Sequence, residues 1–329
     1  MYNSKMIEKA PVAILMPKVE NYERTQIRYG GLVHELGIRG VDCFFAEQHT
    51  SYNSDTHHFN NPRDLSWVPR ADITGEASVV RDLTMTLDDQ PLFSDSVGPI
   101  VVHAPELNRY IAHKDNLVYD APEIHPLTQV VDQDDIDEAV ANLPGSKAVV
   151  KPIVGMRSQG VVAGDKASVV QHEFADGRYL VQEFIDTSHG IPEYGINGVH
   201  NLRVLSIDRE TIGAIGREGG QSTEMLSGDM YGNIIEPDRL SPDVQRIVGT
   251  VHDVLARQAG DGHNVIAIDI MHGLNASGEM VDILCEINRR PQRISRYDLR
   301  DQRNLDMEGI KWLGSQWDKH EAEMLTKLR

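Results

Sequence analysis

The stretch from residue 264 to residue 292 constrains the fold of this chain most. Its sequence, NVIAIDIMHGLNASGEMVDILCEINRRPQ, holds two apolar runs separated by Ser277-Gly278, and small-residue pairs of this kind close two-residue hairpin loops. Each run is long enough for a strand that crosses a sheet. We therefore predict an antiparallel hairpin.

This turn would fix the register of the hairpin. On one face the opposed residues are apolar, and on the other face Asp269 lies directly across from Glu286, with Asn288 as the diagonal neighbour one strand period further along. The apolar face would hold the pairs Leu274 with Val281, Ile270 with Cys285, and Ile268 with Ile287. Three oxygen-bearing side chains therefore converge at one end of an apolar ribbon.

Two carboxylates that face each other across a sheet repel, and burying them beside Ile and Leu is costly unless something compensates. A hard divalent cation compensates well, because Mg²⁺ takes oxygen ligands and is often shared between carboxylates and a phosphate. The alternative is a solvated sheet edge with Asp269 and Glu286 both in water, and a change of turn by one residue would also break their pairing.

Composition narrows the classes of function. The chain has 329 residues, a formal net charge of −18 and a pI near 5.1, which argues against nucleic acid or an anionic membrane as a main partner. Its only cysteines, Cys43 and Cys285, give no disulfide framework or cysteine metal site. The N-terminus lacks the features of a signal peptide, and no apolar run approaches membrane length. We expect a cytoplasmic protein.

The N-terminal part predicts a parallel sheet. Apolar runs at 11–16, 41–46 and 99–103 indicate strands, and residues 22–36 between the first two indicate a helix. This order is typical of a Rossmann-like unit. No G-x-G-x-x-G follows the first strand, so a dinucleotide site is not indicated. The polar region 47–96 gives no clear pattern.

Helical patterns occur at four further places. Residues 108–121 look like a linker that enters a short helix carrying Lys114. An acidic amphipathic helix is predicted over 131–143, and two more over 242–259 and 310–328.

Between these helices, residues 146–165 indicate strand, loop, strand. The loop from Gly155 to Gly160 has the spacing of a P-loop but lacks the Lys and Ser/Thr that should follow it. A glycine-bounded loop beside Lys151 can still cover phosphates through main-chain N–H groups and one ammonium. The alternative is a plain hairpin with a surface lysine.

The region that precedes the 264–292 hairpin indicates further strands, and two of them carry an arginine each. Residues 178–186 indicate a strand, and 200–220 a hairpin that turns at Asp208–Glu210, with Arg203 near its start and Arg217 near its end. Glycines recur in the following segment, 219–233, and favour a flap that orders when ligands bind.

Taken in order, these segments resemble the ATP-grasp superfamily, and within it the branch of glutathione synthetase and ribosomal-protein glutamate ligases. The resemblance is carried by VVKP with its glycine-bounded loop, LVQEFI, the strand with Arg203, GREGG, and IDI…EIN, and it covers about residues 108–292. It implies an α/β architecture: a Rossmann-like domain over 1–107, a lid subdomain over 108–185, and a C-terminal subdomain with the metal site over 186–329, the last two clasping ATP between them.

The resemblance also implies roles for individual residues. Asp269, Glu286 and Asn288 match the Mg²⁺ ligands, with Mn²⁺ as an alternative ion. Arg217 would contact the transferring phosphoryl group and Arg203 the acceptor substrate, both as catalytic and substrate-binding residues. ATP would be held by Lys114 and Lys151 at its phosphates, by main-chain groups of Gln182 and Ile185 with Glu183 beside them at the adenine, and by Asn201 near the ribose or phosphates.

Three features depart from the family. One is the long interval between Asp269 and Glu286, which the register of the hairpin absorbs. The loop GMRSQG is poorer in glycine than its relatives, and Arg289-Arg290-Pro291 follows Asn288 where small residues are common. Arg290 can bind a substrate carboxylate or pair with an acid such as Asp282.

The activity implied is carboxylate–amine ligation through an acyl phosphate, with release of ADP and phosphate. The substrates would be a small carboxylate and an amine, such as amino acids or peptides. The protein itself would be a monomer or a homo-oligomer. Two alternatives stay open: a small-molecule kinase on the same fold, and an ATP-binding scaffold without catalysis, similar to synapsins.

Overall fold

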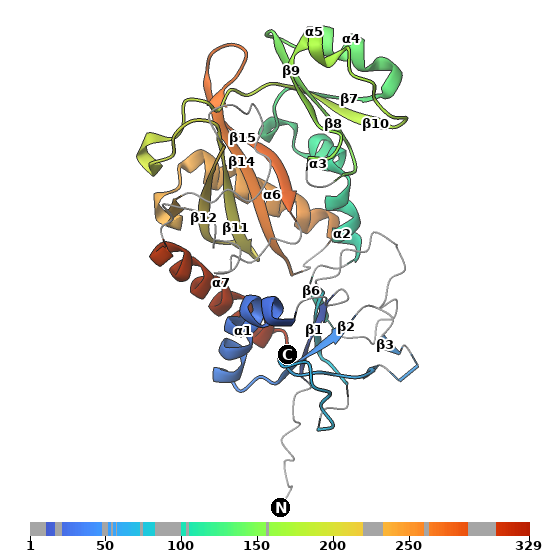
Figure 1. Ribbon diagram of the computed structural model, residues 1–329, viewed down its shortest axis with the longest axis vertical. Coiled ribbons are helices and arrows are strands. Elements are labelled where there is room, and N and C mark those ends of the chain that lie inside the picture. The colour runs from blue at the N-terminus through green and yellow to red at the C-terminus, as the bar shows by residue number, and fades with distance from the viewer. Residues whose placement is uncertain are drawn as a thin grey trace, which may run out of the picture.

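Three larger sheets follow one another along the long axis of the protein (Figure 1). The computed structural model describes residues 11–16, 22–47, 52–53, 55–56, 58–72, 75–82, 100–102, 105–155, 158–219, 233–259, 263–288 and 307–329. No helix among these residues is both long enough and apolar enough to cross a membrane.

The N-terminal sheet is parallel, as predicted, in the order β2-β1-β5-β6. Its strands are β1 (Val12–Met16), β2 (Cys43–Glu47), β5 (Val79–Asp82) and β6 (Ile100–Val102), and α1 (Tyr22–Ile38) connects β1 to β2. Two short strands, β3 (Tyr52–Asn53) and β4 (His58–Phe59), form a separate ladder.

Strand β5 is absent from the sequence prediction, which treats 99–103 as the third strand of the sheet. In the structure β5 lies between β1 and β6. Its sequence, VVRD, is too short and too polar to be recognised as a buried strand. Arg81 occupies a buried position, where an apolar residue would be expected. The Arg81 guanidinium is buried there against the carboxylate of Glu321, with Nε and Oε1 2.7 Å apart.

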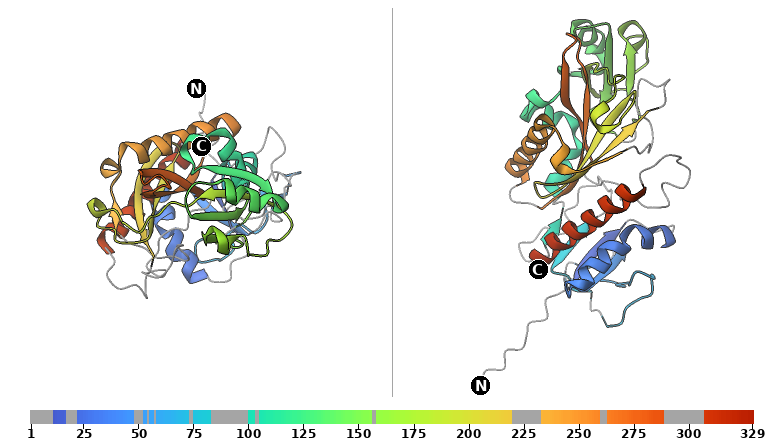
Figure 2. Two further views of the ribbon diagram at one scale, coloured as in Figure 1. Left: turned by 90° about the horizontal axis from the view of Figure 1, so that it is seen from above. Right: turned by 90° about the vertical axis from the view of Figure 1, so that its left-hand side faces the viewer.

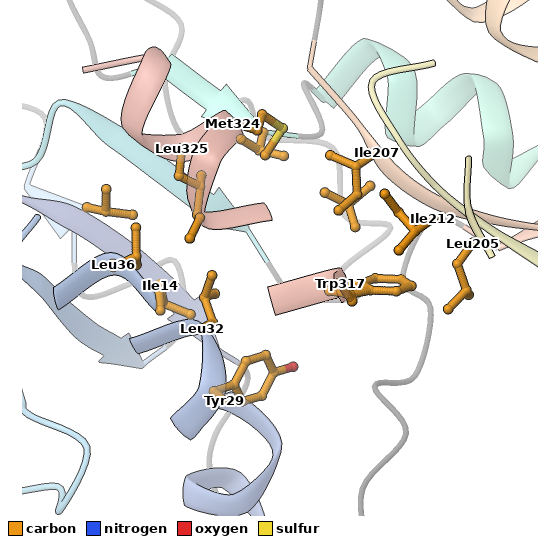
Figure 3. Packing of buried hydrophobic residues seen from close by; sticks show 14 of the residues in the cluster. Ile14, Tyr29, Leu32, Leu36, Leu205, Ile207, Ile212, Trp317, Met324 and Leu325 are labelled. Atoms are coloured by element: carbon orange, nitrogen blue, oxygen red, sulfur yellow. The ribbon is translucent and has the colours of Figure 1, made fainter. Parts of the chain in front are cut away.

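The C-terminal helix α7 (Met307–Lys327) packs on helix α1 of the N-terminal unit. It lies between α1 and the central sheet (Figure 2, right). Trp317 and Leu325 share one core with Ile14 and Leu32 on one side and Ile207 on the other (Figure 3). Trp317 is therefore a packing residue. The boundaries 1–107, 108–185 and 186–329 stay a prediction, although residues from both ends of the chain build this core.

The second sheet lies in the region predicted to be the lid and is antiparallel, in the order β7-β10-β8-β9. Two helices, α2 (Pro105–Ala112) and α3 (Lys114–Asp120), lead into it. Its strands are β7 (Thr128–Asp132), β8 (Lys147–Pro152), β9 (Val162–Asp165) and β10 (Arg178–Glu183), and α4 (Ile136–Asn142) and α5 (Lys166–Val169) pack on one face.

The helix predicted over 131–143 is therefore wrong in its first half. Residues Thr128–Asp132 form β7, which pairs with β10, and a helix begins only after the acidic turn, at Ile136. Val130 and Val131 favour an extended strand next to β10, and this pairing prevails over the helical pattern that continues from α4.

The central sheet is antiparallel in the order β13-β12-β11-β14-β15. Its strands are β13 (Ile234–Ile235), β12 (Glu210–Glu218), β11 (His200–Ile207), β14 (Val265–Leu274) and β15 (Met280–Asn288). Helix α6 (Pro242–Ala259) covers one face, where Ile247 and Val251 pack on Ile266 and Ile268. Four single-turn 3₁₀ helices complete the described structure: Pro122–Ile124, Gln133–Asp135, Pro192–Tyr194 and Pro237–Arg239.

The β14–β15 hairpin is present, but its turn differs from the predicted one. Leu274 pairs with Met280, so the loop has five residues instead of two. Asn275 causes this, because its side-chain oxygen accepts hydrogen bonds from the main-chain N–H groups of Ser277 and Glu279 at 3.0 and 2.9 Å. The predicted pairs near the tip are therefore wrong by one residue.

A β-bulge restores the predicted register further down the hairpin. Ile270 pairs with Leu284 but Asp269 pairs with Glu286, so Cys285 is the extra residue. The predicted pairing of Ile270 with Cys285 is wrong. The pairing of Asp269 with Glu286, on which the metal hypothesis depends, is correct, and so is that of Ile268 with Ile287.

Candidate active site

Asp269 stands at the centre of the candidate site and receives hydrogen bonds from three side chains. Arg203 binds it with a two-pronged fork, Nε to Oδ1 and Nη2 to Oδ2, both at 2.8 Å. Arg217 donates from Nη2 to Oδ2 at 3.0 Å, and the amide nitrogen of Asn288 donates to the same oxygen at 2.9 Å. Oδ2 is therefore surrounded by donors, whereas Oδ1 has one partner among the described residues.

Sheet register explains why these side chains meet. Arg203 on β11 pairs with Asp269 on β14, which in turn pairs with Glu286 on β15, so the three residues form one row across three strands. Arg217 on β12 extends the group through Asn201, its partner on β11. The site is thus built on a rigid element.

The charges of this row fix the protonation state of Asp269. Burial alone would raise the pKa of this fully buried carboxyl, but Arg203, Arg217 and the amide of Asn288 together hold its pKa below the ordinary value. Asp269 is therefore an anion near neutral pH. Both arginine side chains are largely buried too, with 12% of their surface exposed.

Glu286 and Asn288 keep oxygen atoms available for a ligand. Within the described part of the chain, the Glu286 carboxylate has no hydrogen-bond or ion-pair partner. Asn288 bonds Asp269 through its side-chain nitrogen, and its side-chain oxygen has no partner among the described residues. An oxygen-only donor set of this kind suits Mg²⁺. Asp269 fits less well, because the guanidiniums already occupy most of its lone pairs.

No cluster of three or more His, Cys, Asp or Glu side chains able to hold a metal occurs among the described residues. The predicted set is consistent with this finding, since its third member is an amide. The assignment of Asp269, Glu286 and Asn288 as metal ligands remains a prediction.

Two lysines reach the same place from the lid side. Lys151 on β8 is 8% exposed and donates from Nζ to the main-chain oxygen of Cys285 at 3.0 Å. Lys114, the first residue of α3, donates to the main-chain oxygen of Gly155 at 2.8 Å. Burial lowers the pKa of Lys114, Glu286 opposes this shift, and Lys151 adds to it. Both ammonium groups thus lie near the carboxylate row and beside the glycine-bounded loop.

The structure places the predicted adenine residues at the end of β10. Gln182 is buried, its side chain donates to the hydroxyl of Thr128 at 2.7 Å, and its main chain lies between β7 and β8. Ile185 lies just beyond the strand, and its main-chain N–H and C=O have no hydrogen-bond partner among the described residues. Such free main-chain groups after a strand suit recognition of a purine edge.

Glu183 also contacts the central sheet. Its carboxylate accepts a hydrogen bond of 2.7 Å from the main-chain N–H of Ala276, at the tip of the β14–β15 hairpin. The next residues bind the same hairpin, because Asp186 and Leu274 exchange two main-chain hydrogen bonds of 2.9 and 3.0 Å. Gly273 permits this approach, since a Cβ there would lie 2.5 Å from the oxygen of Asp186. The hairpin tip is thereby fastened to the base of the lid.

Some predicted features fall outside the described residues. These are Arg290, most of the predicted flap (220–232), and residues 156–157 of the glycine-bounded loop. The described ends of that loop, Gly155 and Gly160, both lie near Pro152. The strands on either side, β8 and β9, pair antiparallel as predicted.

The sequence prediction missed two groups beside Lys151. One is the main-chain oxygen of Cys285, which the bulge leaves outside the regular ladder and which receives Lys151. The other is His125, which lies near Lys151, and whose pKa is lowered to about 3 by burial and then by that ammonium. A carbonyl leaves no signal in a sequence, and a single histidine next to a proline gives a weak one.

Comparison with known proteins adds the name of the fold. No family model and no curated protein matches the sequence. Solved structures do match. A RimK domain ATP-grasp protein from Sphaerobacter thermophilus has a TM-score of 0.53 and 17% sequence identity, over 94% of this chain and 99% of that one. D-alanine–D-alanine ligase from Bacillus anthracis, complexed with ATP, has a TM-score of 0.53 and 14% identity, over 97% and 99%. This chain has the ATP-grasp fold.

A further match within the ATP-grasp fold is the ligase PsnB, complexed with a phosphomimetic variant of its minimal precursor, Mg and ADP. It has a TM-score of 0.50 and 14% identity, over 94% of this chain and 99% of that chain. The glutathione synthetase and ribosomal-protein glutamate ligase branch predicted from the sequence is compatible with the RimK domain match. The predicted fold class is confirmed.

Proposed function

We propose that this protein is an ATP-dependent ligase that joins a carboxylate to an amine, releasing ADP and phosphate. One observation carries the proposal: among the described residues, four cationic side chains lie around two carboxylates, Asp269 and Glu286. The four cations are Lys114, Lys151, Arg203 and Arg217. This local excess of positive charge lies in a protein whose net charge is −18. It suits a polyphosphate and the anions formed from it.

In the proposed reaction, an oxygen of the substrate carboxylate attacks the γ-phosphorus of ATP, and the bond to the β-phosphate oxygen breaks to release ADP. The amine then attacks the carbonyl carbon of the acyl phosphate, loses a proton, and displaces phosphate. The site needs no protein nucleophile for these steps. It works by holding the reactants in place and neutralising charge.

The residues divide this work by position. Lys114 and Lys151 hold the ATP phosphates from the lid side, and the main chain at Gln182 and Ile185 receives the adenine. Arg217 binds the phosphoryl group in transfer and Arg203 the acceptor substrate. These roles agree with the contacts described above, in which the lysines come from the lid and the arginines from the central sheet.

Mg²⁺ is the ion that the site suits, with Mn²⁺ as the alternative. When bound, the metal would supply charge neutralisation on the phosphates. Glu286 and Asn288 would hold it through their available oxygens, and Asp269 through Oδ1. ADP with Mg in the PsnB structure, and ATP in the ligase from Bacillus anthracis, support this part of the proposal.

Amino acids or peptides are the substrates we favour, because D-alanine–D-alanine ligase and PsnB with its precursor are among the similar structures. A cytoplasmic location, the exclusion of nucleic acid and membrane as partners, and a homo-oligomeric state remain predictions from the sequence.

Release of ADP, measured against panels of amino acids and small carboxylic acids, each alone and in pairs, tests the proposal. A ligase requires two substrates and yields a product whose mass is their sum less one water. A kinase would release ADP with one substrate and yield a phosphate ester. A scaffold would bind ATP and release no ADP with any pair, and either of these two results would overturn the ligase assignment.

A further inference from the structure

Arg217 can act on a ligand in the proposed ligase only if its guanidinium is held in a fixed orientation. A flexible arginine loses rotamer entropy when it binds, which weakens binding. In this structure two protein groups already fix it. Nη2 donates to Asp269 and Nε donates to the side-chain oxygen of Asn201 at 2.8 Å.

These two contacts use two sides of the planar guanidinium and leave the third. Nη1 has no hydrogen-bond partner among the described residues. Its two N–H bonds, together with the second N–H of Nη2, are therefore the part of Arg217 that remains for an anionic ligand.

Asn201 is well placed to hold this orientation. It is 7% exposed, and it lies directly across from Arg217 in the β11–β12 ladder, so the contact joins neighbours on two paired strands. The orientation of its amide is fixed as well. A guanidinium only donates hydrogen bonds, so the Asn201 oxygen must face Nε.

We propose that Asn201 is a positioning residue, which orients Arg217 rather than binding ATP itself. Asp269 cannot orient Arg217 alone, because it contacts only Nη2 and is shared with Arg203, whose fork occupies both of its oxygens. Asn201 supplies the second point that stops the guanidinium from turning about that contact. This inference rests on the proposed function of Arg217, and it differs from the ATP contact that the family resemblance implies for Asn201.

The first experiment measures the orientation without using activity. In the wild-type protein, the Nε–H of Arg217 should give a protected ¹⁵N–¹H signal, which is assigned by its loss in Arg217→Lys. In Asn201→Leu, which removes the acceptor and keeps a similar volume, exchange of this proton with water should accelerate about tenfold or more. Asn201→Asp keeps an acceptor at the same place and should retain the protection. Unchanged exchange in Asn201→Leu would overturn the proposal, whether or not the protein proves to be a ligase.

The second experiment separates positioning from direct contact. Asn201→Leu should lower kcat about tenfold and leave the dissociation constant of ATP within about twofold of wild type. In an Arg217→Lys background the same substitution should change kcat less than twofold, because no Nε remains to be held. An equal loss in both backgrounds would show that Asn201 acts independently of Arg217, and a weakening of ATP binding by about tenfold would show that it contacts the nucleotide. Either result would overturn the proposal.

A matched variant guards against a general effect of replacing a buried asparagine. Asn264 is also 7% exposed but lies at the opposite end of β14, outside the site. Asn264→Leu should leave both kcat and the Arg217 signal as in wild type. If Asn201→Leu does not fold, Asn201→Ser, which is too short to reach Nε, replaces it in both experiments.

Discussion

The two faces of strand β14 differ in what they do. On the face toward α6, Ile266, Ile268 and Ile270 are all fully buried in one apolar core. On the other face, Val265 and Ala267 belong to the core shared with α7, but the next residue on that face is the fully buried Asp269. One face is uniform, whereas the other changes from core to charged site within a single strand period. The uniform face supports the strand and the changing face places the site.

The largest expected effect tests the supporting face. Ile268→Ala should lower the free energy of unfolding by about 2–5 kcal/mol, because it removes buried methyl groups and leaves a cavity under α6. Nucleotide binding should be unchanged at temperatures where the variant is folded. Ile283→Ala in the adjacent strand is the control, since Ile283 is only partly buried and should cost less. Denaturant unfolding with and without ATP measures both variants, and weaker ATP binding by folded Ile268→Ala would contradict this division.

Glu286→Gln tests the functional face. The amide keeps the shape of the side chain and removes the charge, so turnover that depends on Mg²⁺ should fall about a hundredfold or more while stability changes little. Glu279→Gln at the exposed tip of the same hairpin is the matched control and should keep wild-type turnover. Steady-state kinetics over a Mg²⁺ titration are the measurement. Wild-type turnover in Glu286→Gln would remove Glu286 from the metal site.

Arg217→Lys asks whether the functional face needs a guanidinium or only a positive charge. The lysine keeps the charge but cannot bind Asn201, Asp269 and a ligand together. We expect kcat to fall about tenfold or more, with the affinity for ATP retained. Kinetics beside a nucleotide-binding titration distinguish the two. An unchanged kcat would mean that Arg217 has no role in the chemistry.

Asp269→Asn should change two quantities in opposite directions: the affinity for metal-free ADP and the gain in affinity that Mg²⁺ provides. Removing the carboxylate charge leaves Arg203 and Arg217 without their shared counter-ion, so the site becomes more positive. ADP without metal should then bind several-fold more tightly, whereas the gain in affinity that Mg²⁺ provides should shrink. Calorimetry in EDTA and in Mg²⁺ measures both quantities. Weaker binding of metal-free ADP would contradict the charge argument.

The sequence was informative where contacts are local. Asp269 and Glu286 lie on two strands of one hairpin, and their pairing could be predicted because two deviations, the five-residue loop at Asn275 and the bulge at Cys285, cancel. The contact of Arg203 with Asp269 could not be predicted in the same way. It joins residues 66 positions apart, through a pairing of β11 with β14 that no turn sequence specifies.

The remaining errors have similar physical causes. Strand β5 was missed because its buried position 81 holds an arginine instead of an apolar residue. The carboxylate that neutralises this arginine belongs to Glu321, 240 positions away. The anchoring of Lys151 was missed because its acceptor is a main-chain oxygen. Sequence patterns thus indicate which side chains carry charge, whereas the partners that hold them depend on tertiary structure.

The smallest effect is expected at the far end of the α6 face, where polar groups replace the isoleucines. His272 and Asp282 pair across β14 and β15, with Nδ1 and Oδ1 2.7 Å apart, and Ser241 also donates to Asp282 at 2.8 Å. The hydrogen bond with Asp282 raises the pKa of His272 above its ordinary 6.5, against the effect of burial, and the charge of Glu193 adds to the rise. Burial would raise the pKa of Asp282, but the hydrogen bonds from His272 and Ser241 hold it below 3.8.

These shifts define a pH window for the stability that the pair provides. The contribution of His272 is complete below pH 6.5 and is lost as the pH rises through its folded pKa. The contribution of Asp282 is present above pH 3.8 and is lost as the pH falls through its own folded pKa. His272→Gln should therefore cost about 1 kcal/mol of unfolding free energy near pH 5.5, and less near pH 9. His263→Gln is the control, since the His263–Asp208 pair is 34% and 39% exposed and contributes less. A cost for His272→Gln that is equal at both pH values would mean that the pair acts through packing rather than through charge.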